Sequence, residues 1–284
     1  MSAEQTCQSA VRAGEGSDDI LHKIVAAKRL EVERQKKAVS LRTLLALGAE
    51  RMDRPVYSMS KALNRSQSGI IAEFKRRSPS KGWLFPGALI EDVIPEYQRA
   101  GASACSILTD EDFFGGSLGD LQAARKKAGI PLLRKDFIID EYQLFQSRVM
   151  GADAVLLIAA ALSRTDCASL ASTAHSLGLE VLLEIHGEEE LGYLTPEVDM
   201  LGVNNRNLGT FHTDVANSFR LTEHIKASAG SSSTVLVSES GISDVDVVRR
   251  LRQSGFRGFL IGEAFMKSQQ PGEALASFIG GLAL

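Results

Sequence analysis

The chain has 284 residues, of which 44% are hydrophobic and 24% are charged, as in an ordinary globular protein that can bury a large core. Lys and Arg number 32 and Asp and Glu number 35, so the formal net charge is −3 at pH 7. This balance argues against a general nucleic-acid or anionic-membrane surface, and any anionic ligand must be met by local positive charge.

The cysteines and the apolar segments bound the cellular setting. Cys7, Cys105 and Cys167 are scattered and show no metal-ligand spacing, so a reducing cytoplasm is the simplest expectation. Glu4 and later acidic residues interrupt any apolar signal core at the N-terminus. The longest apolar run, residues 154–162, is too short to cross a bilayer and favours a buried strand, so we expect no membrane partner.

The first 68 residues come before any strand pattern. Residues 1–17 are small and polar, and we expect them to be disordered. Residues 18–50 predict one helix, because apolar residues recur at helical spacing after a capping Asp. Residues 51–68 contain a proline and several serines and are expected to be irregular. Residues 18–68 together are therefore predicted to form an N-terminal helical extension.

From residue 69 onward, a short β-branched run, a polar loop and an amphipathic helical stretch recur as one unit. The predicted strands are residues 69–75, 104–110, 131–137, 152–159, 180–185, 200–205, 234–240 and 258–263. The predicted helices lie near residues 87–101, 117–128, 140–150, 163–178, 187–194, 214–229, 243–255 and 271–282. Strict alternation implies a parallel sheet with helical crossovers, and this number of units favours a closed (β/α)8 TIM barrel over residues 69–284.

A doubly wound open sheet is the alternative α/β architecture. It usually has fewer strands and a glycine-rich nucleotide-binding turn after the first one. Here the first strand runs into Glu-Phe-Lys-Arg-Arg-Ser-Pro-Ser at residues 73–80. We therefore predict a TIM barrel that forms a single domain with its N-terminal helical extension.

Charged residues gather at the predicted carboxyl ends of the strands. Side chains alternate faces along a strand, so Ile71, Glu73 and Lys75 share the face that points into the barrel mouth. The same test brings polar or charged side chains from three other strands to the mouth: Lys135, Glu184, Asn204 and Arg206. Any one of them could be an ordinary strand-end charge. Together, two carboxylates and two ammonium groups can separate one another's pKa values, as acid–base catalysis requires.

Two glycine turns follow the last two predicted strands, at Ser240-Gly241 and at Gly262-Glu263. Glycine lets backbone N–H groups approach an anion closely, and phosphate sites in this architecture commonly lie after strands seven and eight. The carboxylate of Glu263 must point away if its N–H binds phosphate. The loop at residues 78–82 could close over the same ligand. Plain βα turns and a plain loop are the alternatives.

These residues resemble the indole-3-glycerol phosphate synthase family from about residue 19 to the C-terminus. Its most specific segments are IAEFKRRSPS at 71–80, LRKDF at 133–137, LEIH at 183–186, GVNNRNL at 202–208, SESGI at 238–242 and LIGE at 260–263. Each segment lies near the end of a predicted strand. The leading helix resembles the family's N-terminal extension, which covers the barrel mouth and helps to bind substrate.

The resemblance implies a carboxy-lyase of tryptophan biosynthesis. Such an enzyme converts 1-(2-carboxyphenylamino)-1-deoxyribulose 5-phosphate into indole-3-glycerol phosphate and releases CO₂ and water. The family uses no metal or organic cofactor, so we expect none. We expect a phosphorylated small molecule as the ligand, no nucleic-acid or obligate protein partner, and a cytoplasmic monomer.

The resemblance also implies roles for the charged residues. Lys135 is expected to protonate the ketone oxygen as the ring closes, and a crowded basic mouth should lower its pKa. Glu184 is expected to act as general base, and Glu73 to stabilise the cationic iminium. Lys75 would meet the substrate carboxylate or assist loss of the hydroxyl group. Two further residues would orient the substrate, namely Asn204 and Arg206.

Further residues are expected to bind the substrate. The aromatic ring would lie against Phe114, Phe137, Leu156, Ile158 and Leu208, although plain core packing would also explain each of them. The phosphate would be held by Ser78, Ser240, Gly241, Gly262 and Glu263. His186 follows Glu184 closely, but no second His or Cys stands at ligand spacing. We therefore predict no metal site and a supporting or surface role for His186.

Three alternative functions remain to be weighed. A phosphoribosylanthranilate isomerase would need a Cys base and an Asp acid at the strand ends, whereas the first strand here offers Glu-Phe-Lys. A metal-dependent epimerase would need several His and Asp at the mouth. A non-catalytic ligand-binding barrel could keep the fold without the chemistry. The set of acids and lysines argues against this last alternative, because a binding module need not retain both.

Overall fold

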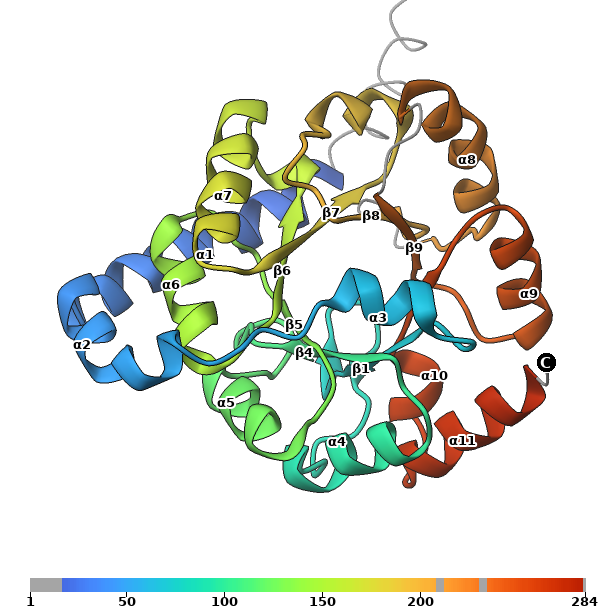
Figure 1. Cartoon of the computed structure of the whole chain (residues 1–284), viewed down its shortest axis with the longest axis horizontal. Coiled ribbons are helices and arrows are strands. Elements are labelled where there is room, and N and C mark those ends of the chain that lie inside the picture. The colour runs from blue at the N-terminus through green and yellow to red at the C-terminus, as the bar shows by residue number, and fades with distance from the viewer. Residues whose placement is uncertain (1–16, 208–211, 230–233, 283–284) are drawn as a thin grey trace, which may run out of the picture.

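A computed structural model describes residues 17–207, 212–229 and 234–282 of the chain. Figure 1 shows a ring of strands enclosed by a ring of helices. The barrel strands are parallel and close in the order β1-β10-β9-β8-β7-β6-β5-β4. The predicted α/β TIM barrel with an N-terminal helical extension is confirmed.

Every barrel strand falls within a predicted segment. The strands are β1 (Ile70–Phe74), β4 (Ala104–Leu108), β5 (Leu132–Lys135), β6 (Ala154–Ile158), β7 (Glu180–Ile185), β8 (Met200–Asn204), β9 (Val235–Glu239) and β10 (Gly258–Ile261). Closure depends on β1, because Ile71 pairs with Leu260 of β10 on one side and with Ala104 of β4 on the other. The first and last strands of the barrel are therefore neighbours.

The outer helices also follow the predicted pattern, with one exception. They are α4 (Ile90–Arg99), α5 (Leu118–Lys127), α6 (Glu141–Met150), α7 (Arg164–Ser176), α8 (Ala216–Ala229), α9 (Val245–Gln253), the short α10 (Glu263–Met266) and α11 (Pro271–Gly281), with a 3₁₀ turn η1 (Ala159–Ala161) after β6. The segment predicted as a helix near 187–194 is instead the 3₁₀ helix η2 (Glu188–Tyr193). It buries no residue, so it lacks the apolar face that stabilises a regular α-helix.

The N-terminal extension consists of α1 (Ser17–Ala38), α2 (Leu41–Met52) and α3 (Met59–Arg65). The prediction of one helix over 18–50 is wrong, because Ser40 caps a new helix by accepting a hydrogen bond from the backbone N–H of Thr43 at 3.2 Å. The prediction of an irregular segment over 51–68 is also wrong, because Ser58 caps α3 in the same way. The predicted disorder of the first residues lies outside the described residues, except that Ser17 begins α1.

Helix α3 covers the amino-terminal end of the barrel, in front of the strands in Figure 1. Met59 and Leu63 are fully buried and pack in the same cluster as the barrel interior. Ser58 and Ser60 donate hydrogen bonds to Glu180, the first residue of β7. Side chains of α3 therefore close this end of the barrel.

Helix α1 covers the opposite end. Its Lys28 is buried and contacts Asp110 and Asp136, which lie just beyond the carboxyl ends of β4 and β5, at 2.9 Å each. Ile20, Leu21 and Ile24 of the same helix line the cavity at this end. A buried ionic contact and an apolar contact thus fix the helix over the barrel mouth.

The predicted alternation along the strands is confirmed. Ile70, Ala72 and Phe74 of β1 belong to the core between the sheet and the helices, whereas Ile71 belongs to the core inside the barrel. Each fully buried aliphatic or aromatic side chain contributes roughly 1.5–3 kcal/mol. The inward face of β1 therefore carries Glu73 toward the mouth, as expected.

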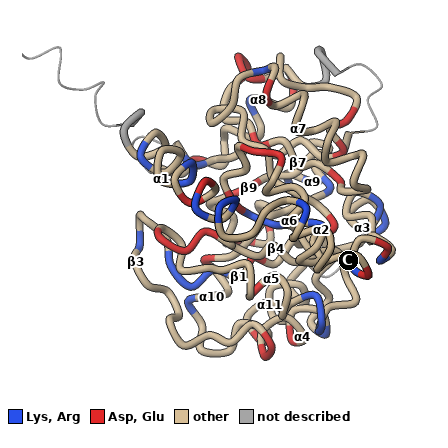
Figure 2. The backbone as a smooth tube through the Cα atoms, turned by 90° about the vertical axis from the view of Figure 1, so that its left-hand side faces the viewer, with Lys and Arg blue, Asp and Glu red and all other residues tan. Residues whose placement is uncertain are grey.

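Basic and acidic residues are interspersed along the chain. Figure 2 shows Lys and Arg interspersed with Asp and Glu along the backbone in this view, with both kinds on α1. Within the described part of the chain, no helix is long and apolar enough to span a membrane.

Candidate active site

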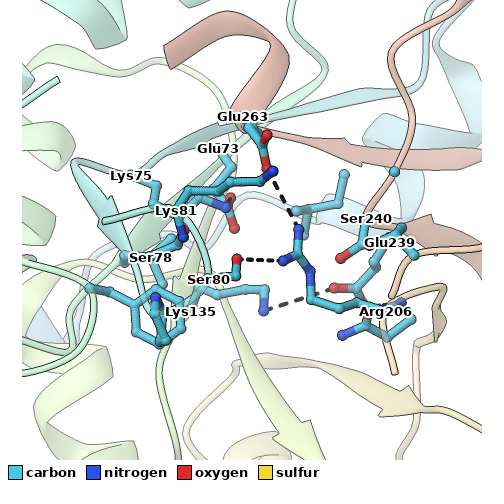
Figure 3. A pocket seen from close by; sticks show the side chains of 18 of the residues that line it. Glu73, Lys75, Ser78, Ser80, Lys81, Lys135, Arg206, Glu239, Ser240 and Glu263 are labelled. Atoms are coloured by element: carbon cyan, nitrogen blue, oxygen red, sulfur yellow. Dashed lines mark hydrogen bonds and ion pairs between the residues drawn. The ribbon is translucent and has the colours of Figure 1, made fainter. Parts of the chain in front are cut away.

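The carboxyl end of the barrel holds a cavity of about 630 Å³. The ends of β1, β5, β7, β8, β9 and β10 all contribute to it, and α1 supplies an apolar rim. Figure 3 shows acidic and basic side chains from distant parts of the sequence pointing into this space. The expected convergence of Glu73, Lys75, Lys135, Glu184 and Asn204 is present, because all of them line the one cavity.

Lys135 lies between two buried carboxylates. Its Nζ is 3.4 Å from Glu184 Oε2 and 3.9 Å from Glu239 Oε2, and Figure 3 shows it beside Glu239. Glu184 is 2% exposed and Glu239 is 1% exposed. Gly202 makes room for this pair, because a Cβ at that position would collide with Glu239 Oε1. Two acids and one ammonium group therefore share the floor of the cavity.

The surroundings push the pKa values of the two acids apart. Burial and repulsion from Glu184 raise the pKa of Glu239 to about 8. Burial also acts to raise the pKa of Glu184, but attraction to Lys135 and His186 outweighs it and holds that pKa below its ordinary value. At neutral pH Glu184 is therefore charged while Glu239 is protonated, so neighbouring carboxyls offer a base and an acid.

The expectation of a lowered pKa for Lys135 is wrong. Burial lowers the pKa, but Glu184, Glu239 and Glu73 outweigh burial and raise it above the ordinary value. The second cavity lysine does not press on it, because Lys75 Nζ pairs with Glu73 Oε2 at 2.5 Å. The surroundings of Lys135 therefore favour its charged ammonium form in the free protein.

Glu73 and Lys75 form a second acid–base pair on β1 and its end. Glu73 is buried, and it packs against Gly262, where a Cβ would collide with Glu73 Oε2. The side chain of Lys75 is 15% exposed and faces the cavity. Gly262 therefore serves a purpose that the sequence did not reveal, since it admits a carboxylate as well as offering its own backbone.

Asn204 and Arg206 are linked to each other and to different sides of the cavity. Asn204 Nδ2 donates to Glu184 Oε1 at 3.0 Å, and its Oδ1 accepts from the backbone N–H of Arg206 at 3.0 Å. The Arg206 guanidinium donates to Ser80 Oγ at 2.6 Å and lies 3.6 Å from Glu263 Oε2, as Figure 3 shows. Asn204 orients the buried base, and Arg206 joins the loop after β1 to the turn after β10.

The two glycine turns lie side by side, because β9 and β10 are neighbours in the barrel. Among the described residues, Ser240 is the one non-glycine residue with a positive φ, at 67°, and Gly241 follows at 74°. Such a conformation is strained for serine and is typical of functional turns. Gly262 and Glu263 begin α10, and all four residues line the cavity. Their backbone N–H groups are well placed to meet an anion.

The side of the cavity that the glycine turns form contains two further predicted residues. The Glu263 carboxylate pairs with Lys267 at 2.6 Å and with Arg206, which leaves its backbone as the part available to an anion. Ser78 belongs to the small hairpin of β2 (Arg77–Ser78) and β3 (Gly82–Trp83), and its Oγ accepts from the backbone N–H of Lys81 at 3.2 Å. The loop after β1 is therefore an ordered hairpin.

The apolar wall agrees only in part with the prediction. Phe114 and Phe137 line the cavity with their ring centroids 6.1 Å apart, and Ile158 lies beside them. Leu156 does not line the cavity. It is 1% exposed and belongs to the barrel core one layer below, because it precedes Ile158 by two residues on the same strand face. Leu208 lies outside the described residues.

Sequence reasoning missed two features of the site. Glu239 was quoted only for its neighbouring glycine turn, although Val235 and Val237 share its inward face and the alternation test would have found it. Lys28 has no local feature that distinguishes it from the other charged residues of the first helix. Its burial follows from tertiary contacts with Asp110 and Asp136, which no local pattern reveals.

A closed parallel barrel with acids, lysines and two glycine turns in its carboxyl-end cavity defines a (β/α)8-barrel enzyme with acid–base chemistry. The sequence model described as "Indole-3-glycerol phosphate synthase" matches residues 21–278. The chain belongs to the indole-3-glycerol phosphate synthase family.

Similar proteins of known name agree with this assignment. An indole-3-glycerol phosphate synthase of Bacteroides thetaiotaomicron is 60% identical over 265 residues, covering 92% of this chain and 98% of the relative. One of Polaromonas naphthalenivorans is 40% identical over 268 residues, covering 92% and 99%.

Two solved structures share the fold. A 3-hexulose-6-phosphate synthase of Salmonella typhimurium has a TM-score of 0.56 at 13% sequence identity and covers 75% of this chain and 99% of its own. A mutant tryptophan synthase alpha-subunit of Pyrococcus furiosus has a TM-score of 0.56 at 14% identity and covers 76% and 98%. At these identities the likeness concerns the barrel alone.

Proposed function

We propose that this cavity closes the indole ring of indole-3-glycerol phosphate. The substrate would be 1-(2-carboxyphenylamino)-1-deoxyribulose 5-phosphate, and the other products would be CO₂ and water. The chain acts as a carboxy-lyase of tryptophan biosynthesis, in line with the family to which it belongs. One observation carries the proposal: Lys135 stands between a charged and a protonated glutamate in a cavity whose opposite wall is built from two glycine turns.

Lys135 is proposed as the general acid of the ring closure. The aromatic carbon that carries the carboxylate attacks the ketone carbon, and the ketone oxygen becomes an alkoxide. An alkoxide is far more basic than an amine, so an ammonium group with a raised pKa still transfers its proton to it. The charge of Lys135 also stabilises the developing oxyanion inside a buried cavity, where electrostatic interactions are strong.

Glu73 and Lys75 are proposed to handle the charges that ring closure creates. The attack leaves a cationic iminium, which the buried Glu73 carboxylate would stabilise, while Lys75 would meet the substrate carboxylate or assist loss of the hydroxyl group. The 2.5 Å contact between Glu73 and Lys75 supports a joint role, since the two side chains can meet the substrate together.

Glu184 is proposed as the general base of the dehydration. Its pKa lies below the ordinary value, so it is ionised at neutral pH and can accept the proton that leaves the carbon beside nitrogen. The hydrogen bond from Asn204 Nδ2 fixes its Oε1, and Arg206 would help to orient the substrate from the neighbouring wall. Glu239, protonated beside it, avoids adding a second negative charge next to the substrate carboxylate.

The phosphate group is proposed to bind the turns after β9 and β10. Ser240, Gly241, Gly262 and Glu263 would offer backbone N–H groups, and Ser78 would approach from the hairpin after β1. The aromatic ring would lie against Phe114, Phe137 and Ile158. Leu208 stays a predicted contact of the ring.

We also propose that the enzyme works as a cytoplasmic monomer. The described residues of this chain supply acidic, basic and apolar walls to the cavity. Cys105 and Cys167 are free and buried, which suits a compartment that keeps thiols reduced. Light scattering on the purified protein tests the monomer directly.

The purified protein should be incubated with the carboxyphenylamino-deoxyribulose phosphate while indole absorbance and fluorescence are followed. The proposal expects the indole signal to appear with release of CO₂ in equal amount. Substrate binding without turnover, measured by calorimetry on the same sample, would support a non-catalytic barrel instead. Conversion of phosphoribosylanthranilate would support the isomerase.

A further inference from the structure

His186 stands in the wall between the active-site cavity and a second cavity of about 450 Å³. Both cavities share Leu21, Asn204, Arg206 and His212 as lining residues, so they lie back to back. Glu184 faces the first cavity and His186 faces the second. The two residues are separated by one position on the end of β7, yet they belong to different spaces.

The imidazole of His186 bridges two carboxylates. Its Nε2 is 3.5 Å from Glu184 Oε1, and its Nδ1 is 3.6 Å from Glu190 Oε2. Glu190 is held there because its Oε2 accepts the backbone N–H of His186 at 2.5 Å. Both ring nitrogens are buried and have no closer hydrogen-bond partner in the described part of the chain. The imidazole ring of His186 therefore lies between Glu184 of the active-site cavity and Glu190 of the second cavity.

The second cavity reaches the protein surface. His22 on its rim is exposed, and the side chains of Asp214 and Arg220 are 47% and 64% exposed. Water and buffer can therefore approach Glu190 from this side. The active-site cavity also opens to the surface, since the exposed Lys81 and Lys267 lie on its rim, but a bound substrate would fill it.

The proposed reaction consumes a proton, and this point rests on the proposed function. The ketone oxygen gains two protons and leaves as water, while one proton comes off the carbon beside nitrogen. CO₂ leaves without a proton, because the electrons of the broken carbon–carbon bond stay on the ring and neutralise the iminium. One proton per turnover must therefore come from solvent and reach groups that the substrate covers.

A continuous series of titratable groups leads from the second cavity to Lys135. Glu190, His186, Glu184 and Lys135 follow one another at 3.6, 3.5 and 3.4 Å. We propose that His186 conducts the solvent proton from Glu190 to Glu184, and that it acts as a positioning residue for Glu184 without touching the substrate.

Each transfer in this series is balanced. Glu190 takes a proton from water or buffer and passes it to His186 Nδ1, while His186 Nε2–H gives its proton to Glu184 Oε1. Glu184 then passes this proton to the neutral amine of Lys135, which restores the ammonium group. The imidazole is left with its proton on Nδ1, and it returns to the Nε2–H form when Nδ1 gives that proton to Glu190 and Nε2 takes one from a water molecule.

The charges around His186 favour this role. Burial lowers the pKa of His186, but Glu190 and Glu184 outweigh burial and the repulsion from Lys135, so that the pKa lies above the ordinary value. The groups that face the ring are Glu184 on β7, Glu190 on η2 and Lys135 on β5, and the rim of the cavity adds His22, His212, Asp214 and Arg220. The protonated imidazole, which can give a proton to Glu184, is therefore favoured by its surroundings.

His186→Gln and His186→Ala test the proposal, with His175→Gln as the matched control. His175 is a partly exposed histidine that contacts Asp199 on the outside of the barrel. We expect both His186 variants to lower kcat by about 100-fold with KM nearly unchanged, the low end of what a positioned proton transfer contributes. The alkaline limb of the kcat profile that belongs to His186 should disappear, and the control should match the unmodified protein.

Chemical rescue separates proton transfer from a structural role. Imidazole and substituted imidazoles added to His186→Ala should restore turnover, and the restored rate should follow the pKa of the added base. A structural role predicts that His186→Gln retains near-normal kcat, or that rescue is absent, and either result overturns the proposal. Should His186→Ala not fold, an unchanged solvent isotope effect on kcat in His186→Gln overturns it equally. An unmodified protein that does not form the indole signal would instead reject the proposed function.

Discussion

Lys135 illustrates how a single residue is tuned by its neighbours. An isolated buried ammonium group would lose charge, because burial disfavours the ionised form. Here Glu184 and Glu239 reverse that effect and hold the pKa of Lys135 above its ordinary value. The protonated form of Lys135, the proposed acid, is therefore favoured before substrate binds. It is proposed to transfer its proton when a sufficiently basic oxygen forms on the substrate.

Lys135→Ala should lower kcat by about 10²–10⁴-fold, the range typical of a lost general acid, with the fold retained. Steady-state kinetics and circular dichroism check the two parts separately. Lys61→Ala is the matched control, because Lys61 is exposed on α3 at the opposite end of the barrel. Near-normal kcat in the Lys135 variant would reject the acid role.

Glu239→Gln should change how stability depends on pH. The folded-state pKa of about 8 exceeds the ordinary value of 4.5, so the folded protein keeps a proton that the unfolded chain releases between these values. Stability contributed by this group is therefore lost as pH rises through that window, by at most about 1.4 kcal/mol per pH unit. Glutamine cannot titrate, so the free energy of unfolding of the variant should increase relative to that of the unmodified protein as pH rises.

Urea unfolding of both proteins at about pH 5 and about pH 8 measures this difference, which should be on the order of a few kcal/mol. The pKa of Glu184 is lowered, so this group changes the pH dependence of stability only below its ordinary pKa and therefore outside the window of Glu239. The raised pKa of His186 is common to both proteins, so the comparison removes its contribution to first order. A difference that does not vary with pH would show that Glu239 is charged in the folded state.

At the residue scale, the sequence predicted which side chains share a strand face, because that alternation is regular. It did not predict contacts between residues on different strands. Strand alternation predicted that Glu73, Lys135 and Glu184 face the mouth, because the period of two is fixed by the backbone. It could not predict the partners that set the pKa of Lys135, since those belong to strands far away in the sequence. The same limit explains why Leu156 was placed one layer too high.

At the element scale, α1 is joined to the barrel by a buried ionic cluster. Lys28 Nζ contacts Asp110 Oδ2 and Asp136 Oδ1 at 2.9 Å each and Glu31 Oε2 at 2.7 Å. Asp136 also accepts a hydrogen bond from the Arg134 guanidinium. Burial alone would raise the pKa of Asp136, but attraction to Arg134 and Lys28 outweighs burial and lowers that pKa to about 2. Asp136 directly follows Lys135, the proposed general acid, so the cluster holds the helix and the end of β5 together.

Lys28→Met should destabilise the protein by about 3–5 kcal/mol, because it leaves buried carboxylates without their cation. It should also raise KM, since Ile20, Leu21 and Ile24 on the same helix line the cavity. Urea unfolding and steady-state kinetics check both effects. Arg29→Met, an exposed change on the same helix, should stay within about 0.5 kcal/mol. Equal stability of the two variants would contradict the cluster's importance.

The elements of the barrel were predictable, and those of the extension were not. Eight amphipathic repeats gave the strands within one or two residues, because each strand has a helix that must cover it. The break at Ser40 and the helix α3 depend on capping hydroxyls and on contacts with the barrel ends. Met59 and Leu63 become apolar anchors only once a barrel exists to receive them.

At the scale of the whole molecule, the proposed anion site joins the beginning and the end of the barrel. Ser78 follows β1, whereas Gly241 and Gly262 follow β9 and β10, and β1 pairs directly with β10. A ligand that binds all of these groups binds only the closed barrel. Its binding free energy is therefore added to the free energy of global unfolding.

Inorganic phosphate or sulfate should raise the unfolding midpoint and compete weakly with substrate. The stabilisation should reach about 1.4 kcal/mol when the anion is tenfold above its Kd. Chloride at matched ionic strength is the control, because it screens charges equally without three oxygens to accept the N–H groups. Identical unfolding midpoints and KM values in phosphate and chloride would count against the anion site.

The pairing of β1 with β10 also decides the order of events during synthesis. Until β10 has left the ribosome, β1 and β9 both present unpaired edges, and such edges readily recruit strands from other chains. During most of its translation the nascent polypeptide therefore has an open sheet with aggregation-prone edges. Pairing of β10 with β1 and β9 closes this sheet. Protection by chaperones is expected to matter most in that interval, and catalytic competence arrives all at once, with the sealing strand.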